Sequence, residues 1–322
     1  MSERHQVEVT SQEREEFKRL DAFLAAKFPK YSRSLIKKFF EKGFFTSKDT
    51  KLDLKKIPSS DCVIFFHEPD PEPVDIQPQD IPLDILFEDE HLIVINKPAG
   101  LVVHPAAGNR DGTLVNALLF HIKDLKGIGS ELRPGIVHRL DKGTSGIMVA
   151  AKSQAAHEGL VKLFSSHDIA RKYQALALGA RIPSEQTLES MIGRSSHNRL
   201  KMTTKTSQGK SAMTHLKVVE YFKFVSHIEC TLETGRTHQI RVHLSELINA
   251  PIINDPLYGR EGDAKRLLSN DIKSILKGYE HPLLHAKVLG FKHPITGQEM
   301  YFEQEPPEIF QRCLEQFRSE SE

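Results

Sequence analysis

The residues best suited to covalent chemistry lie in the run HRLDKGTSG at residues 138–146. Ile136 and Val137 before this run, and the apolar residues 147–151 after it, predict buried strands. Two glycines between these strands permit backbone angles that other residues avoid, so we expect a tight loop that carries Asp141. A carboxylate held there can attack a substrate or stabilise cationic sugar character. The alternative is a turn aspartate that bonds only its own backbone, through the hydroxyl residues that follow it.

A catalytic carboxylate in a water-excluding site has to stay ionised, although removal from water raises the pKa of an aspartate. A neighbouring arginine opposes that rise and lowers the pKa by roughly one to three units. We therefore expect an arginine from another part of the chain beside Asp141. Arg236 is the candidate, because Gly235 permits a sharp turn and Thr237 can cap the helix that follows. An arginine in a purely structural ion pair is the alternative. The helix is expected to bury Ile240, Leu244 and Leu247.

An aromatic side chain lies in the alternating run RKYQALALG at residues 171–179. The period of two predicts a strand that places Tyr173, Ala175 and Ala177 on one face. Small residues beside the tyrosine leave room for a flat base. An ordinary core tyrosine is the alternative.

Metal and disulfide sites are not predicted. His238 and His243 have neither the HExxH spacing nor a carboxylate ligand pattern, which disfavours a metal. Cys62, Cys230 and Cys313 are widely separated, odd in number and without a CxxC pattern, so we expect free thiols.

Six motifs of the chain resemble, in the same order, those of the RluA-type pseudouridine synthases. His138 and Ser145 favour this type over the related RsuA type. Within the family the chain is most similar to the RluD group, which acts on bacterial large-subunit ribosomal RNA. The matching motifs are NKPAGLVVHP (96–105), RPGIVHRLDKGTSG (133–146), RKYQALALG (171–179), ETGRTHQIRVH (233–243), DPLYG (255–259) and LLHAKVLGFKHPITG (283–297).

The resemblance implies an isomerase that converts uridine in structured RNA to pseudouridine without a cofactor. The glycosidic N–C bond is broken and the uracil is rejoined through carbon, which requires no metal, redox change or energy source. By this resemblance Asp141 is the nucleophile, acting on a flipped-out uridine. Tyr173 stacks on the uracil, Arg236 pairs with Asp141, and Arg139 enters the RNA near the extruded base.

The N-terminal part of the chain resembles an S4 RNA-binding module. The first 17 residues are polar and are expected to form a solvated tail. Residues 19–45 predict two short helices, the second capped by Ser32, and residues 62–66 predict a buried strand. We place the module at residues 18–66. The resemblance implies phosphate contacts along the exposed side of its second helix by Arg33, Lys37 and Lys38, and the alternative is a solvated helix face.

The net charge of +1 conceals segments of opposite charge. Residues 18–56 hold twelve Lys or Arg against four Asp or Glu, whereas residues 67–90 hold nine acidic residues and no Lys or Arg. Electrostatic interactions reach only about 10 Å at 0.1 M salt. Binding therefore depends on the charge of a local patch rather than on the net charge of the whole chain. The acidic, proline-rich residues 67–82 are expected to be an extended linker. Residues 190–217 carry six Lys or Arg and no acid. They resemble the RNA-gripping loop of the family, with Arg194, Arg199 and Lys201.

From residue 83 to residue 322, strands and helices are interspersed without a regular βαβ repeat. This pattern predicts an α+β catalytic domain with a mixed, largely antiparallel sheet flanked by helices and loops. One helix is expected at residues 153–165, starting at Ser153. Its apolar stripe comprises Ala156, Leu160, Val161 and Phe164.

The sequence also predicts the cellular location of the protein and what it binds. No apolar run is long enough to cross a bilayer, and the polar N-terminus lacks a signal peptide. We therefore expect a cytoplasmic, monomeric protein without a membrane partner. The expected partner is a stem-loop of ribosomal RNA, free or within a pre-ribosomal large subunit, because flipping a base costs less in a loop than in a duplex.

Two other classes of protein are alternatives to the isomerase. A non-catalytic RNA-binding or ribosome-assembly protein on the same fold is disfavoured by the presence of Asp141, Tyr173 and Arg236 together. A carboxylate glycosidase would require a second catalytic carboxylate and aromatic platforms for sugars, but the chain has no Trp and only 7% aromatic residues.

Overall fold

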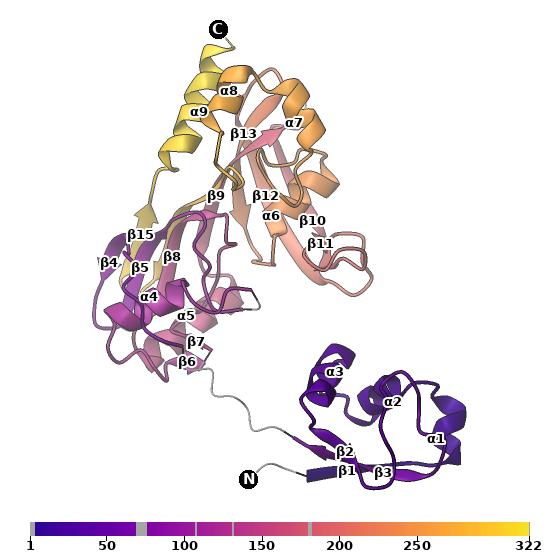
Figure 1. Cartoon of the computed structure of the whole chain (residues 1–322). Coiled ribbons are helices and arrows are strands. Elements are labelled where there is room, and N and C mark those ends of the chain that lie inside the picture. Colours follow the sequence, from indigo (N-terminus) through magenta and orange to yellow (C-terminus); the bar gives the residue numbers. More distant parts are fainter. Residues whose placement is uncertain (1–3, 69–75, 107, 131, 180–181, 322) are drawn as a thin grey trace. The chain divides into compact units, whose positions relative to one another are not determined.

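The computed structural model describes residues 4–68, 76–106, 108–130, 132–179 and 182–321. Residues 1–74 and residues 75–322 form two compact units (Figure 1). None of the helices in these described ranges is long and apolar enough to cross a membrane.

The N-terminal unit packs three helices against a small antiparallel sheet. The strand order is β1-β3-β2, so the central strand β3 pairs on both sides. Phe66 of this strand stacks on Phe45 with ring centroids 4.4 Å apart, at the centre of a separate aromatic core. The elements are β1 (Arg4–Val9), α1 (Ser11–Glu16), α2 (Leu20–Lys27), α3 (Arg33–Glu41), β2 (Phe45–Ser47) and β3 (Cys62–His67).

The two predicted helices and the predicted strand of this unit are confirmed, but the solvated tail is not. The Ser32 hydroxyl accepts the N–H of Leu35 and so caps α3 as expected. Residues 4–16, in contrast, form β1 and α1. The alternation around Val7 and Val9 is short and lies in a polar sequence, so it did not predict a strand. In the structure, β1 is stabilised by its pairing with β3 and by the burial of Val9 in the core of this unit.

The second unit is built on one long mixed sheet, which confirms the predicted fold class. Among the described residues its strand order is β11-β10-β12-β13-β9-β14-β8-β5-β4, with β15 beside β14. Only the pairing of β14 with β8 is parallel. The strands are β4 (Ile85–Glu88), β5 (Leu92–Lys97), β8 (Ser145–Ala151), β9 (Ala170–Leu178), β10 (Glu185–Arg194), β11 (Met202–Thr203), β12 (Lys210–Tyr221), β13 (Val225–Leu232), β14 (Leu284–Lys292) and β15 (Glu299–Glu303).

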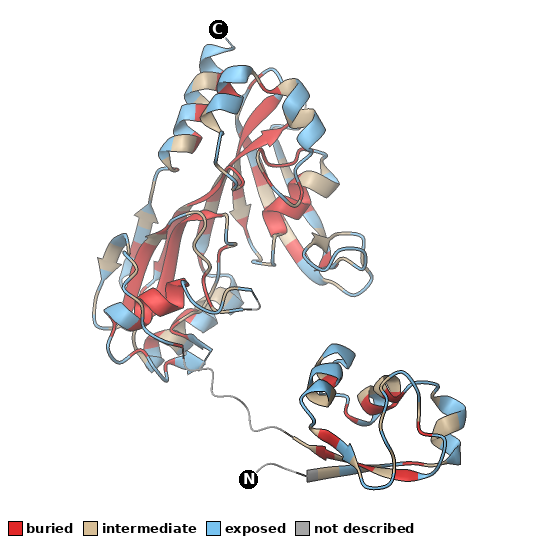
Figure 2. Cartoon of the chain, viewed as in Figure 1, coloured by how far each residue is buried: buried red, intermediate tan, exposed pale blue. Residues whose placement is uncertain are grey.

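Helices flank this sheet at both ends, and its central strands are the most deeply buried part of the unit (Figure 2). A short hairpin of β6 (Gly129–Ser130) and β7 (Arg133–Pro134) precedes the loop of Asp141. The helical elements are α4 (Leu114–His121), α5 (Gln154–Ser166), α6 (Gln239–Val242), the π-helical turn η1 (His243–Leu247), α7 (Glu261–Leu267), α8 (Asn270–Ile275) and α9 (Glu308–Ser319).

Helix α5 is confirmed with its cap, since the Ser153 hydroxyl accepts the N–H of Ala156. Its predicted stripe is only partly buried, because Val161 is 40% exposed and lines a pocket. The strand expected at Ile136 and Val137 is absent from the described structure, where Ile136 makes a single bridge to Ala150. At this point the chain turns toward the pocket, so its backbone cannot continue the hydrogen bonds of a sheet.

The expected linker at residues 67–82 is shorter than predicted. Residues 69–75 lie outside the described residues. His67 ends β3, and Ile76 is buried in the core of the second unit. The amide of Asn116 in α4 donates to the carbonyl of Gln77 at 2.8 Å, so the chain is already anchored there.

Candidate active site

The loop between β7 and β8 presents Asp141 at the edge of the central strands. The N–H of Thr144 donates to the carbonyl of Asp141 at 3.1 Å and closes the turn. Gly146, where β8 begins, has φ 116°, and a Cβ there would lie 2.3 Å from the carbonyl oxygen of Ala286. Only glycine permits this close approach of β8 to β14. The local sequence therefore determines the backbone turn that carries Asp141.

A buried lysine supports the same loop from behind. Lys97 has no exposed surface, and its ammonium donates to the carbonyls of Pro98, Leu101 and Lys142 at 2.9, 3.0 and 3.3 Å. Burial lowers its pKa to about 7, and the charge of Asp141 opposes that shift. Because residue 142 follows Asp141 directly, this bond ties the reactive loop to the end of β5.

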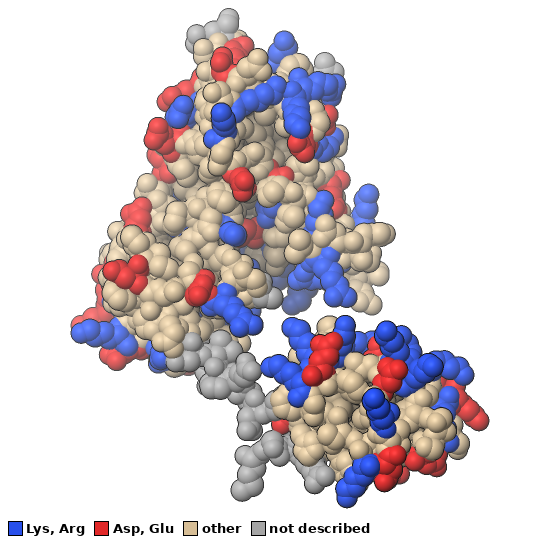
Figure 3. All heavy atoms as spheres, viewed as in Figure 1, with Lys and Arg blue, Asp and Glu red and all other residues tan. Residues whose placement is uncertain are grey.

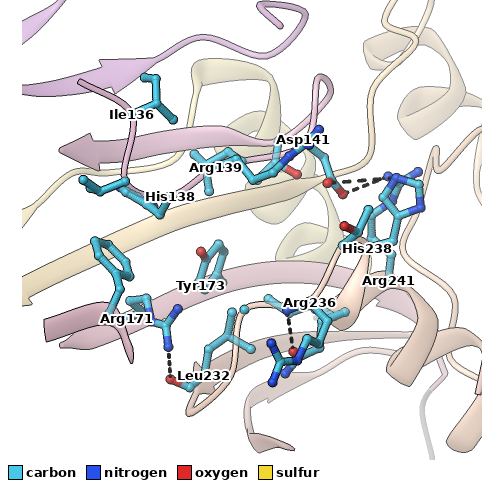
Figure 4. A pocket seen from close by; sticks show the side chains of 18 of the residues that line it. Ile136, His138, Arg139, Asp141, Arg171, Tyr173, Leu232, Arg236, His238 and Arg241 are labelled. Atoms are coloured by element: carbon cyan, nitrogen blue, oxygen red, sulfur yellow. Dashed lines mark hydrogen bonds and ion pairs between the residues drawn. The ribbon is translucent and has the colours of Figure 1, made fainter. Parts of the chain in front are cut away.

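The arginine that pairs with Asp141 is Arg241 and not Arg236. Nη1 of Arg241 donates to Oδ2 of Asp141 at 2.9 Å (Figure 4). The same guanidinium donates through Nε and Nη2 to the two oxygens of Asp255, at 2.7 and 2.8 Å. Its side chain is 6% exposed. A buried arginine with two carboxylate partners holds the Asp141 carboxylate in one orientation.

Arg236 lies before α6 and lines the pocket, but its side chain bonds β12 and not Asp141. Its Nε donates to the carbonyl of Ser211 in β12 at 2.9 Å, and among the described residues it forms no ion pair. The expected cap at Thr237 is also wrong, since His238 precedes the first helical residue and the Gln239 side chain accepts the N–H of Arg236. Ile240 and Leu244 are buried as predicted, whereas Leu247 is 39% exposed.

One signal in the sequence could have found Arg241. It stands between two apolar residues in the run QIRVHL, on a helix expected to be buried. A fully buried arginine requires counter-charges. Asp255 of the DPLYG motif is the second carboxylate that the fold supplies.

Tyr173 projects from β9 into the same pocket, on the strand and face that its alternation predicted. The ring is 8% exposed. Burial raises the pKa of Tyr173 to about 12, and the charge of Asp141 acts in the same direction, while that of Arg171 opposes it. The phenol is therefore protonated and neutral at physiological pH.

His138 closes the pocket wall behind this tyrosine. Its Nε2 accepts the N–H of Val149 at 3.1 Å, and its ring stacks on Phe164 at 4.4 Å. Burial, with a smaller contribution from the charge of Arg171, lowers its pKa to about 3. The imidazole is thus neutral and forms part of the pocket wall, and it does not act as a proton donor.

These residues surround a pocket of about 500 Å³, within the range of small-molecule sites of roughly 300–1,000 Å³ (Figure 4). Arg139 is exposed at its edge and has no hydrogen bond or ion pair with any other residue in the described ranges. Most of the rest of the lining comes from β9, the loop before β8, helix α5, and the segment from the end of β13 into α6. The pocket therefore combines the oriented carboxylate of Asp141, the buried ring of Tyr173 and the exposed guanidinium of Arg139.

Apart from Arg139, the predicted RNA-binding residues lie on α3 of the N-terminal unit and on the hairpin between β10 and β12 of the second unit. Figure 3 shows Lys and Arg side chains gathered over the α3 side of the N-terminal unit and around the hairpin between β10 and β12. On α3, Arg33 pairs with Asp21 at 2.9 Å and Lys37 lies 3.6 Å from Glu41. These side chains and Lys38 are exposed, as are Arg194 and Arg199 in the hairpin, while Lys201 lies over the ring of Tyr258.

The two histidines whose spacing disfavoured a metal form hydrogen bonds with other side chains. His238 bonds Tyr258, and His243 lies between Ser190 and Thr214 with hydrogen bonds of 3.0 Å to each. Within the described ranges there is no group of three or more His, Cys, Asp or Glu that could hold a metal ion.

Comparison with known proteins agrees with this geometry. A profile of the RNA pseudouridylate synthase family matches residues 91–246. Ribosomal large subunit pseudouridine synthase D of Zymomonas mobilis is 46% identical over 299 residues, which cover 91% of this chain and 92% of that protein. The protein of the same name from Xanthomonas campestris is 41% identical, covering 94% of this chain and 90% of that protein. Among solved structures, human RNA Pseudouridylate Synthase Domain Containing 4 is similar, with 28% identity, a TM-score of 0.57, and coverage of 73% of this chain and 93% of that chain.

A mixed sheet that presents an aspartate, held by an arginine, beside a buried tyrosine defines an RNA-modifying isomerase. With relatives of this identity and coverage, the chain belongs to the RNA pseudouridylate synthase family. The sequence prediction of an RNA pseudouridine synthase of the RluA type is confirmed.

Proposed function

We propose that the chain converts uridines of bacterial large-subunit ribosomal RNA to pseudouridine, with Asp141 as the nucleophile. The observation that carries this proposal is the ion pair of Asp141 Oδ2 with Arg241 at 2.9 Å, which leaves Oδ1 free to face the pocket. The relatives named above supply the substrate, since their names specify the large ribosomal subunit.

The reaction breaks the bond between N1 and C1′ and forms one between C5 and C1′. The proton on C5 is lost and N1 gains one, so no electrons are exchanged with a cofactor. Asp141 attacks the sugar or stabilises its cationic character, as carboxylates do in glycoside hydrolysis. Tyr173 stacks against the uracil while it rotates. Its neutral phenol adds no charge next to the departing base.

RNA reaches this pocket as an extruded nucleotide. Arg139, exposed and without a protein partner in the described ranges, occupies the space that the uridine leaves in the stack. Flipping is easiest in loops, which favours a stem-loop target, free or within a pre-ribosomal large subunit. The basic hairpin and α3 bind phosphates, and we place the reaction in the cytoplasm, with the protein acting as a monomer.

The test uses large-subunit ribosomal RNA transcribed with tritium at C5 of uridine. Wild-type protein is expected to release tritium, and Asp141→Asn is expected to release none while keeping its fold and RNA affinity. Asn preserves the backbone turn at residue 141 but has no charge with which to react. Tritium release by Asp141→Asn at the wild-type rate would exclude Asp141 as the nucleophile. Release by neither protein, despite tight binding, would favour the non-catalytic RNA-binding alternative or another RNA substrate.

A further inference from the structure

We propose that His238, oriented by Tyr258, is a positioning residue that directs the free oxygen Oδ1 of Asp141 toward the substrate. This inference rests on the proposed function, in which Asp141 reacts. It assigns a role to two side chains that the chemistry described so far does not use.

His238 has a backbone conformation that is uncommon for its residue type. Its φ is 58°, in the left-handed region, at the position just before α6. Side chains other than glycine enter this region at a cost, and such residues persist where the surrounding structure holds them. The conformation turns the imidazole toward the carboxylate of Asp141, where Nε2 lies 4.0 Å from Oδ1 (Figure 4).

Tyr258 determines which nitrogen of this imidazole carries the proton. Its hydroxyl oxygen accepts the N–H of Met202 at 2.7 Å. The hydroxyl proton then has two acceptors, Nδ1 of His238 at 2.8 Å and the carbonyl of Met202 at 3.3 Å. Donation to the nearer acceptor leaves Nδ1 without a proton, so Nε2 carries it and faces Asp141.

The surroundings of the imidazole favour its neutral form. Burial lowers the pKa of His238, and the cations Arg241 and Arg139 add to this shift. The carboxylates Asp141 and Asp255 oppose it. Burial also raises the pKa of Tyr258 to about 12, so its hydroxyl keeps the proton that it donates.

Different side chains therefore face the two oxygens of Asp141. Oδ2 accepts from Arg241, and Nε2 of His238 lies 4.0 Å from Oδ1. Tyr258 supports both, because its hydroxyl bonds His238 and its ring lies 5.1 Å from the guanidinium carbon of Arg241. Catalytic hydrogen bonds are often long before substrate binds. The distance of 4.0 Å between Nε2 and Oδ1 has to shorten on substrate binding for this hydrogen bond to form.

The experiment compares His238→Gln with His238→Met, two side chains of similar length at the same strained position. Gln retains an N–H that can reach Asp141, whereas Met fills the space without a donor. We measure the single-turnover rate of tritium release from C5-labelled ribosomal RNA, and RNA affinity separately. His238→Met is expected to lower the rate roughly 10- to 100-fold with unchanged affinity. His238→Gln is expected to recover most of that loss.

A second variant tests the support supplied by Tyr258. Tyr258→Phe removes the hydroxyl but keeps the ring against Arg241, and it is expected to lower the rate roughly 3- to 10-fold. Tyr221→Phe is the matched control, because it deletes a hydroxyl that donates at 2.8 Å to the carbonyl of Ile182, away from the pocket. This control is expected to keep the wild-type rate.

Equal rates for His238→Gln and His238→Met would overturn the proposal, since a space-filling role does not distinguish the two. A wild-type rate in Tyr258→Phe would overturn the orienting role of its hydroxyl. Failure of the proposed function is a different result, because it shows as full tritium release by Asp141→Asn or as no release by the wild-type protein.

Discussion

Asp255 accepts two hydrogen bonds from Arg241, of 2.8 and 2.7 Å, and so fixes the guanidinium that reaches Asp141. Burial opposes a charge on Arg241, but the hydrogen bonds and charges of the two carboxylates outweigh it and raise its pKa. The N–H groups of Leu257 and Tyr258 also donate to Asp255, so this carboxylate is itself held by its own loop. The orientation of Asp141 therefore depends on a loop that contains no residue proposed to touch the substrate.

We expect Arg241→Met to abolish isomerisation and to destabilise the protein by about 3–5 kcal/mol, because it leaves two carboxylates without their buried partner. Urea denaturation and tritium release measure the two effects. Arg236→Met is the matched control, since it removes an arginine of the same motif that bonds only a backbone carbonyl. It should cost about 1 kcal/mol and leave the chemical step intact. The assignment fails if the two variants behave alike.

The difference between these arginines shows what the sequence could establish at this site. The loop of Asp141 was predictable because glycines, strand-forming residues and a turn all lie within one short segment. The pairing of Asp141 with Arg241 rather than Arg236 was harder to predict, because it depends on which side of a short helix faces the loop of Asp141. That contact joins residues 100 positions apart. For the same reason β1 was not predicted. Among the described residues it pairs with β3 alone, more than fifty residues away.

Lys97→Met is expected to slow isomerisation without weakening RNA binding. The variant removes the donor shared by the carbonyls of Pro98, Leu101 and Lys142, and each buried carbonyl left without a partner costs about 1–3 kcal/mol. The loop next to Asp141 then loses its support at β5. Rates and affinities measured on the same RNA separate the two effects. A wild-type rate in the folded variant would show that Lys97 does not position this loop.

His138→Gln is expected to reduce the loss of stability at acidic pH. The pKa of His138 is depressed to about 3 in the folded protein, whereas an unfolded histidine titrates near 6.5. Between these values the unfolded chain binds more protons, so the unfolding free energy falls as the pH drops below about 6.5. One group contributes a slope of up to about 1.4 kcal/mol per pH unit.

Gln can still accept the N–H of Val149 but does not titrate, so it tests this contribution directly. The wild-type and variant proteins are compared by urea denaturation between pH 4 and pH 7. Other buried histidines contribute equally to both, and the difference in slope isolates residue 138. Parallel curves would mean that His138 is not held neutral by the fold.

Neutralising α3 tests whether the N-terminal unit binds RNA through phosphates. In the triple variant Arg33→Gln, Lys37→Gln, Lys38→Gln, three exposed cations are lost without removing any buried group. If each contacts one phosphate, the slope of log affinity against log salt should fall by about three units. The matched control is Lys273→Gln, Lys277→Gln, Arg312→Gln, which removes three exposed cations around α8 and α9. An unchanged slope in the α3 variant, or an equal fall in the control, would identify α3 as an ordinary solvated helix face.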